Sequence, residues 1–97
     1  MTPEGRVKKK VSEVLKKSGC YFTMPVTGGY GNSGVPDYLV CYRGKFVAIE
    51  CKAGGNTPTA LQLDHIRRIV ESGGRAWVIN EDNISTLQSQ LEQLSNG

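Results

Sequence analysis

Asp37, Glu50 and Lys52 have the side-chain types and the spacing that could carry out chemistry. They fall at the outer ends of two apolar segments, which are typical of a β-hairpin that turns at Arg43-Gly44. In a hairpin with a two-residue turn, Asp37 faces Glu50, with Cβ atoms roughly 5 Å apart. Lys52 lies two positions beyond Glu50 and therefore points to the same side of the sheet.

Two carboxylates that face each other across a sheet repel, which normally destabilises the pair. A divalent cation between them would reverse this effect. Mg²⁺ prefers oxygen ligands and often binds only one or two carboxylates, with water in its remaining positions. A bound ion can acidify a water and neutralise charge on a phosphate, and a lysine beside it can stabilise the transition state. The spacing therefore indicates that the three side chains can share one face of the sheet, where a bound metal ion could act on a phosphate.

A simpler interpretation of the same residues stays open. Asp37 follows a proline at the end of a Gly-rich segment, where an aspartate can serve the turn alone. Glu50 and Lys52 could be an ordinary surface pair. A turn one residue longer would place Asp37 opposite Cys51 and separate the two carboxylates.

The rest of the chain predicts the elements that position these residues. Apolar and turn residues predict the order α-β-β-β-α-β-α, with strands over 20–26, 37–42, 45–52 and 75–80. The predicted helix caps are Thr2, Thr57, and either Asp82 or Asn83, with prolines at the first helical positions 3 and 58. Both faces of the hairpin carry apolar residues, so helices must cover both sides. We expect an α/β fold with a mixed central sheet flanked by helices.

The chain has 97 residues, which suits one small domain over 1–97 with a modest core. Its formal net charge is +3. Cations crowd the first predicted helix, as either a solvated face or a phosphate-binding face. These cations are Arg6, Lys8, Lys9, Lys10, Lys16 and Lys17, of which we expect Lys8, Lys9 and Lys10 to bind DNA.

Other functional classes are disfavoured by composition. Three cysteines without a CxxC pair, together with a single histidine, do not suit a zinc site and indicate a reducing environment. The Gly-rich segment 27–34 lacks the Lys-Ser/Thr ending of a nucleotide-binding loop, so we expect no nucleotide cofactor. No signal peptide or membrane-length apolar run is recognised, and a cytoplasmic location without membrane contact is expected.

Two further polar residues point toward the predicted site. Glu4 lies at the end of the apolar stripe of the first helix, although an acidic residue also suits a helix N-terminus. Gln62 lies near the start of the second helix on its mainly apolar face, where it could contact a phosphate or simply edge the core. His65, one turn later, is interpreted as a packed residue.

At this point the residues resemble a known family. The segments Gly34-Val35-Pro36-Asp37 and Ile49-Glu50-Cys51-Lys52 resemble the bipartite motif of the PD-(D/E)xK nucleases, which have a restriction-endonuclease-like core. The downstream residues resemble the VRR-NUC (virus-type replication–repair nuclease) domain, in the standalone form of bacteriophages. The residues that carry this second likeness are Lys52-Ala53-Gly54-Gly55, Thr57-Pro58, Gln62 and Gly73-Gly74.

The resemblance implies an Mg²⁺- or Mn²⁺-dependent DNA endonuclease and assigns roles to its residues. Asp37, Glu50 and the backbone carbonyl of Cys51 would bind the metal, and Lys52 would be the catalytic lysine. Glu4 would act through metal-bound water. Gln62 would match the glutamine of the family's second helix, as a catalytic and DNA-contacting residue.

The resemblance also implies a homodimer that cuts four-way (Holliday) junctions, as standalone members do. Relatives in DNA repair cut flaps, so a flap- or single-strand-specific nuclease is one alternative. A DNA-binding module without catalysis and a small interaction protein are two others. The apolar seam Ile84, Leu87, Leu91 and Leu94 could form the dimer interface or pack on its own sheet.

Overall fold

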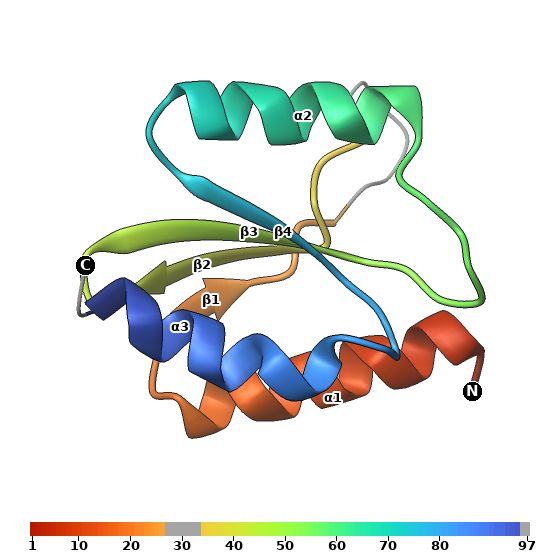
Figure 1. The fold of residues 1–97 in the computed structure, drawn as a ribbon, viewed down its shortest axis with the longest axis horizontal. Helices are drawn as coiled ribbons and strands as arrows, with labels where there is room; N and C mark the ends of the chain where they lie inside the picture. The colour runs from red at the N-terminus through yellow and green to blue at the C-terminus, as the bar shows by residue number, and fades with distance from the viewer. Residues whose placement is uncertain (27–33, 96–97) are drawn as a thin grey trace.

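A four-stranded sheet with helices on both faces makes up this protein (Figure 1). The computed structural model describes residues 1–26 and 34–95. In chain order the elements are α1 Pro3–Lys17, β1 Tyr21–Thr23, β2 Tyr38–Tyr42, β3 Lys45–Cys51, α2 Ala60–Glu71, β4 Arg75–Ile79, the 3₁₀ helix η1 Ile84–Thr86 and α3 Leu87–Ser95. The predicted α/β class and the predicted order of helices and strands are therefore confirmed. Within the described residues, no helix is long and apolar enough to span a membrane.

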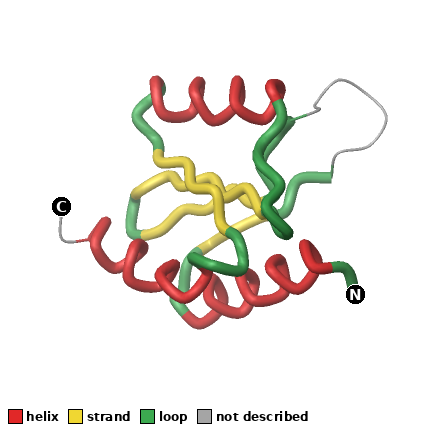
Figure 2. Tube along the Cα trace, turned by 45° about the vertical axis from the view of Figure 1, so that its right-hand side comes forward, coloured by secondary structure: helices red, strands yellow, loops and turns green. Residues whose placement is uncertain are grey.

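The sheet is mixed. Its strand order is β1-β2-β3-β4, where the first two pairs are antiparallel and β3 and β4 are parallel. Parallel strands need a crossover connection, and α2 provides it. Helices α1 and α3 lie together on one face of the sheet, and α2 lies alone on the other (Figures 1 and 2).

Helix α1 begins and ends where its sequence predicts. The Thr2 hydroxyl accepts a hydrogen bond from the Gly5 N–H at 3.0 Å, and proline occupies the first turn. The helix buries Val7, Val11 and Leu15, which recur every fourth residue and therefore share one face. This stripe fixes the helix against the sheet.

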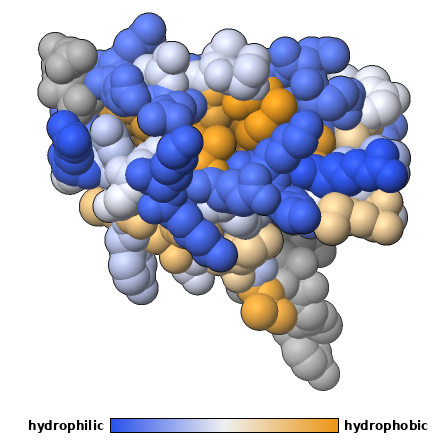
Figure 3. Space-filling model, turned by 90° about the horizontal axis from the view of Figure 1, so that it is seen from below, coloured by the Kyte–Doolittle hydropathy of each residue, from blue (hydrophilic) through white to orange (hydrophobic). Residues whose placement is uncertain are grey.

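The core lies between the sheet and the pair α1 and α3. Leu87 and Leu91 of α3 are fully buried there. The predicted apolar seam thus packs on its own chain, and its two central leucines are not available as a dimer interface. Seen from the side of α1 and α3, polar side chains surround a strip of apolar ones (Figure 3).

Replacing Leu91 by alanine is expected to lower the free energy of unfolding by about 2–5 kcal/mol, because a cavity remains in a packed core. Urea unfolding measures this loss. The matched control is Leu63→Ala on α2, because Leu63 is 53% exposed. An equal loss in both variants would contradict the assignment of α3 to the core.

The strands predicted over 37–42, 45–52 and 75–80 are each one residue shorter in the structure, and two other boundaries differ by more. The strand predicted over 20–26 pairs only over Tyr21–Thr23, and Pro25, which has no N–H to donate, follows soon after. The second helix begins at Ala60 with Thr59 as its cap, not at Pro58 with Thr57. The reason is a capping box, in which the Thr59 hydroxyl accepts from the Gln62 N–H while the Gln62 side chain accepts from the Thr59 N–H.

The third cap is Asn83, one of the two predicted residues, but it precedes η1 and its side chain does not cap the helix. Its side chain instead accepts from the Asn80 N–H and donates to the Val78 carbonyl, which ties the end of β4 to the turn. The predicted Gly-rich loop over 27–34 lies outside the described residues except for Gly34.

Candidate active site

The β2–β3 hairpin has the predicted register. Tyr42 pairs with Lys45, and the ladder continues to Tyr38 and Ile49. Asp37 lies one residue beyond this last pair, and its Oδ2 accepts a hydrogen bond from the Cys51 N–H at 2.8 Å. This bond holds the Asp37 carboxylate against the carboxyl end of β3. The donor, Cys51, is the residue between Glu50 and Lys52 in the sequence.

Glu50 is a buried charged residue, with 3% of its surface exposed. Its Oε2 lies 3.4 Å from the Lys52 Nζ, whereas its Oε1 has no hydrogen-bond partner among the described residues. Burial, and then the nearby charge of Asp37, raise the pKa of Glu50 to about 7, although Lys52 opposes them. This carboxyl therefore changes its charge near neutral pH.

Lys52 follows β3 directly, and its backbone N–H donates to the Ile79 carbonyl of β4 at 2.9 Å. This bond continues the parallel pairing past the end of the strand and fixes the lysine backbone. The side chain is only 12% exposed. The three residues that the sequence predicted as the centre of the site, Asp37, Glu50 and Lys52, therefore lie at one end of β2 and β3.

Lys8 of α1 reaches the same place. Its Nζ lies 3.4 Å from Asp37 Oδ1 and 3.7 Å from Glu4 Oε2. Burial acts to lower the pKa of Lys8, but the attraction of Asp37 and the smaller attraction of Glu4 leave it above its ordinary value. The structure thus places Glu4 at the border of the site, linked to Asp37 through Lys8.

The Tyr38 hydroxyl explains why α1 reaches the site at this point. It donates to the Lys8 carbonyl at 2.8 Å and lies 2.6 Å from the Ser12 hydroxyl. These contacts fix one turn of α1 against β2, directly beside Asp37. Lys8 was predicted only as part of the basic run. Its spacing of four residues from Glu4 could have indicated the pair with Glu4, but not the contact with Asp37.

The three lysines predicted to bind DNA do not share one surface. Successive helical residues point about 100° apart. Lys8 turns toward Asp37, whereas Lys9 and Lys10 are exposed on other sides of α1. A DNA contact by all three would have to wrap around the helix.

Gln62 lies at the start of α2 and uses its side-chain oxygen in the capping box. Within the described residues its amide nitrogen has no hydrogen bond. The start of α2 packs on Gly34, where a Cβ would lie 2.7 Å from the Leu61 carbonyl carbon and where φ is +91°. Only glycine suits this close approach, which brings α2 beside the segment that leads to Asp37.

The described residues contain no cluster of three or more His, Cys, Asp or Glu side chains that could hold a metal. A metal at this site would therefore bind the two carboxylates of Asp37 and Glu50, a main-chain carbonyl such as that of Cys51, and water. Hard cations accept such a ligand set. The unpaired Oε1 of Glu50 is the observation that fits a cation, because a buried carboxylate oxygen otherwise lacks compensation.

Comparison with known proteins relates this arrangement to a family. A solved structure described as a VRR_NUC domain superposes with a TM-score of 0.72 and 28% identity, and the match covers 99% of this chain and 97% of that one. A protein of Acyrthosiphon pisum secondary endosymbiont phage 1, described as "Putative nuclease p44", is 36% identical over 81 residues, which is 82% of this chain and 84% of the relative. The chain belongs to the VRR-NUC family of nucleases.

The VRR-NUC fold extends to more distant proteins. Hjc of Archaeoglobus fulgidus, a Holliday junction resolvase, superposes with a TM-score of 0.52 and 23% identity over 76% of this chain and 64% of that one. This likeness shows a shared fold. No family model matches the sequence.

Proposed function

We propose that this VRR-NUC nuclease is a metal-dependent DNA endonuclease that cuts four-way junctions as a homodimer. The observation that carries the proposal is Glu50, a buried carboxylate with one unpaired oxygen, which lies 3.4 Å from the Lys52 Nζ and close enough to Asp37 to be affected by its charge. A protein gains nothing in stability from such a group, so a role in binding is its best explanation.

Asp37, Glu50 and the Cys51 carbonyl would hold Mg²⁺ or Mn²⁺. When bound, the ion would supply an activated water and neutralise charge on the scissile phosphate. Lys52 would stabilise the transition state from the Glu50 side. Lys8 would leave Asp37 and contact the phosphate, and Glu4 and Gln62 would orient water at the border of the site.

The junction substrate and the dimer rest on other support. Hjc, which shares the fold, is a Holliday junction resolvase. A two-fold dimer would present two sites that cut two strands symmetrically. Because Leu87 and Leu91 of α3 are buried within their own chain, the dimer would use another surface. Sedimentation as a monomer at micromolar concentration, with and without junction DNA, would contradict this part.

The experiment that tests the proposal is cleavage of a labelled panel: four-way junction, flap, duplex and single strand, with Mg²⁺, Mn²⁺ or EDTA. The matched variant is Asp37→Asn, which keeps an oxygen to accept from the Cys51 N–H. Paired symmetric cuts in the junction, lost in EDTA and in the variant, support the proposal. Cuts confined to flaps or single strands would show that the substrate is not the four-way junction. If wild type cuts none of these DNAs, the proposed endonuclease activity would be overturned.

One observation favours a DNA-binding module without catalysis. Lys8 and Lys52 each lie 3.4 Å from a carboxylate, so both Asp37 and Glu50 already have a positive neighbour. Calorimetry with Mn²⁺ separates the two functions. For a binding module, the heat measured on adding Mn²⁺ would be the same in wild type and in Asp37→Asn.

Replacing Lys8 by glutamine is expected to tighten Mn²⁺ binding roughly tenfold, because a positive charge next to the metal site is removed. Calorimetry measures the change. Lys9→Gln is the control, since it removes the same charge from the exposed neighbour on α1. Unchanged Mn²⁺ affinity in Lys8→Gln would place the metal away from Asp37.

A further inference from the structure

A pocket lies at the opposite end of β3 from the carboxylates. We propose that it takes one nucleotide of the substrate strand, with the base against Phe46 and the adjoining phosphates on the cations around it. This inference rests on the proposed function, because the ligand is the DNA that the carboxylates cut.

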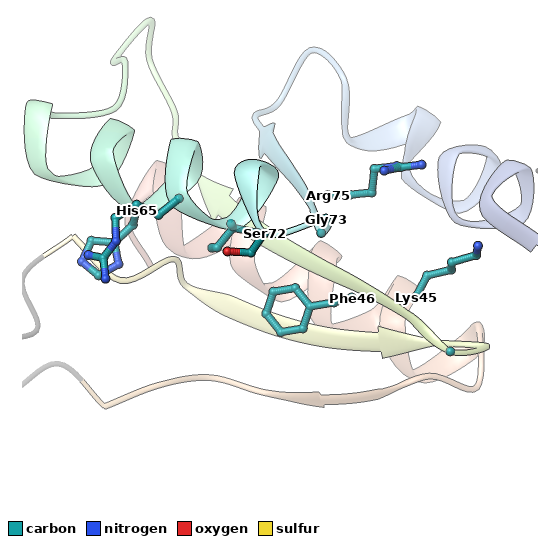
Figure 4. A pocket seen from close by; sticks show the side chains of 10 residues that line it. Lys45, Phe46, His65, Ser72, Gly73 and Arg75 are labelled. Atoms are coloured by element: carbon teal, nitrogen blue, oxygen red, sulfur yellow. The ribbon is translucent and has the colours of Figure 1, made fainter.

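The site is a pocket of about 740 Å³ between the end of α2 and the start of β3 (Figure 4). This volume is within the range of small-molecule sites. The ring of Phe46 lies below the end of α2, with His65 toward one end of the pocket and Lys45 and Arg75 toward the other (Figure 4).

Phe46 is 45% exposed, so part of its surface is open to a ligand. The ring packs closely on Gly74, where a Cβ would lie 3.0 Å from the Phe46 Cδ1 and 3.0 Å from the Ile69 Cγ2. Exposed aromatic rings beside cations are the means by which proteins bind single-stranded nucleic acid, since every base has a face that can stack.

The lining is cationic. Arg68, Lys45 and Arg75 carry its positive charges, His65 adds an imidazole, and none of the described lining residues is acidic. Arg68 has an exposed acidic neighbour, Asp64, at 3.7 Å, a distance at which the pair contributes little. Its charge therefore remains available to a phosphate.

Lys45 and Arg75 lie at the rim of the pocket and not at its floor. The register pairs Lys45 with Tyr42 and Arg75 with Val47, so both side chains leave the sheet on the side away from Phe46. Within the described chain neither takes part in an ion pair. They would meet the strand as it leaves the pocket around the end of the sheet.

The pocket and the carboxylates share one face of the sheet. Phe46 and Glu50 are four residues apart on β3, and alternate residues point to the same side. Their separation along the strand is about 13 Å. Ala48 lies between them on the same face and is only 1% exposed, beneath α2. A strand that reaches both Glu50 and Phe46 would therefore pass along the flank of α2, with an unpaired nucleotide at Phe46.

The first test measures junction and single-strand affinity in EDTA, so that cleavage does not interfere. Phe46→Leu is expected to weaken binding about five- to a hundredfold, the effect of losing one stacked base, while Phe46→Tyr retains it. Thermal unfolding confirms that each variant is folded. Wild-type affinity in Phe46→Leu would overturn the proposal.

The second test uses two neighbouring arginines of α2. Arg68→Gln is expected to lower the slope of log affinity against log salt by about 0.7–0.9, the contribution of one phosphate contact. The control is Arg67→Gln, because Arg67 is held by Asp64 at 2.7 Å and Glu71 at 3.0 Å and does not line the pocket. Equal slopes for both variants would contradict the site.

The third test uses the wild-type protein and needs no variant to fold. Junction DNA with 5-iododeoxyuridine near the cut site is irradiated, and the crosslinked peptide is identified by mass spectrometry. A crosslink at Phe46 supports the site, and crosslinks only at other residues overturn it.

The outcomes separate the two proposals. If wild type neither binds nor cuts DNA, the proposed function fails. If wild type cuts DNA and the Phe46 and Arg68 variants behave like it, this inference fails alone. If Phe46→Leu turns a dimer into a monomer in sedimentation, the pocket is a contact between subunits and the nucleotide site is overturned.

Discussion

Replacing Lys52 by alanine is expected to lower DNA cleavage by at least about a hundredfold while junction binding stays near wild type. The Lys52 Nζ lies 3.4 Å from Glu50 in a nearly closed site, so its charge acts on groups within the site and not on distant phosphates. Loss of one such positioned donor removes transition-state stabilisation without removing uniform binding. Single-turnover cleavage and fluorescence anisotropy, on the same junction, measure the two quantities.

Glu50, which lies beside Lys52, determines the pH at which cleavage is compared. Without the lysine, Glu50 loses the charge that lowers its pKa, so it would hold a proton more tightly. Cleavage is therefore compared well above pH 7, at saturating Mn²⁺. Lys16→Ala, on the exposed side of α1, is the control. Retained cleavage in Lys52→Ala would remove this residue from the mechanism.

Replacing Glu50 by glutamine is expected to abolish metal binding and to remove a pH-dependent loss of stability from the metal-free protein. The folded pKa of Glu50 is about 7, against an ordinary value of 4.5. Between these values the unfolded chain loses its proton while the folded protein keeps it, so stability falls as pH rises from 4.5 to 7. Above pH 7 the loss is constant, at about 3 kcal/mol.

Urea unfolding between pH 4 and pH 9 measures this effect in wild type and Glu50→Gln. In the variant, the free energy of unfolding is expected not to fall between pH 4.5 and 7. Mn²⁺ is expected to stabilise wild type but not the variant. Glu13→Gln, at an exposed position of α1, is the control. A variant that keeps the same fall would show that another group titrates there.

The hairpin register was predictable because its turn is short and specific. Arg43 and Gly44 have φ values of +49° and +82°, as a two-residue hairpin turn with positive φ at both positions requires. The turn then fixes every pair along the strands. This local geometry is why the sequence placed Asp37, Glu50 and Lys52 at one end of the sheet.

Contacts between distant elements were less predictable. The position of Lys8 beside Asp37 depends on how α1 docks through Tyr38, and no local pattern encodes that docking. Asp37 accepts from the Cys51 N–H because the ladder ends one residue earlier. For α2, two threonines near one proline offered two caps, and only Thr59 has a glutamine three residues later to complete the capping box.

The parallel pairing of β3 with β4 has a consequence for the order of folding. The β2–β3 hairpin is local and can form within microseconds, whereas β4 must wait for the whole α2 crossover to close. The hairpin therefore brings Asp37 and Glu50 together before Lys52 is fixed by its bond to Ile79. The repulsion between these carboxylates opposes the early hairpin, so acidic pH or Mn²⁺ is expected to speed refolding in stopped-flow experiments.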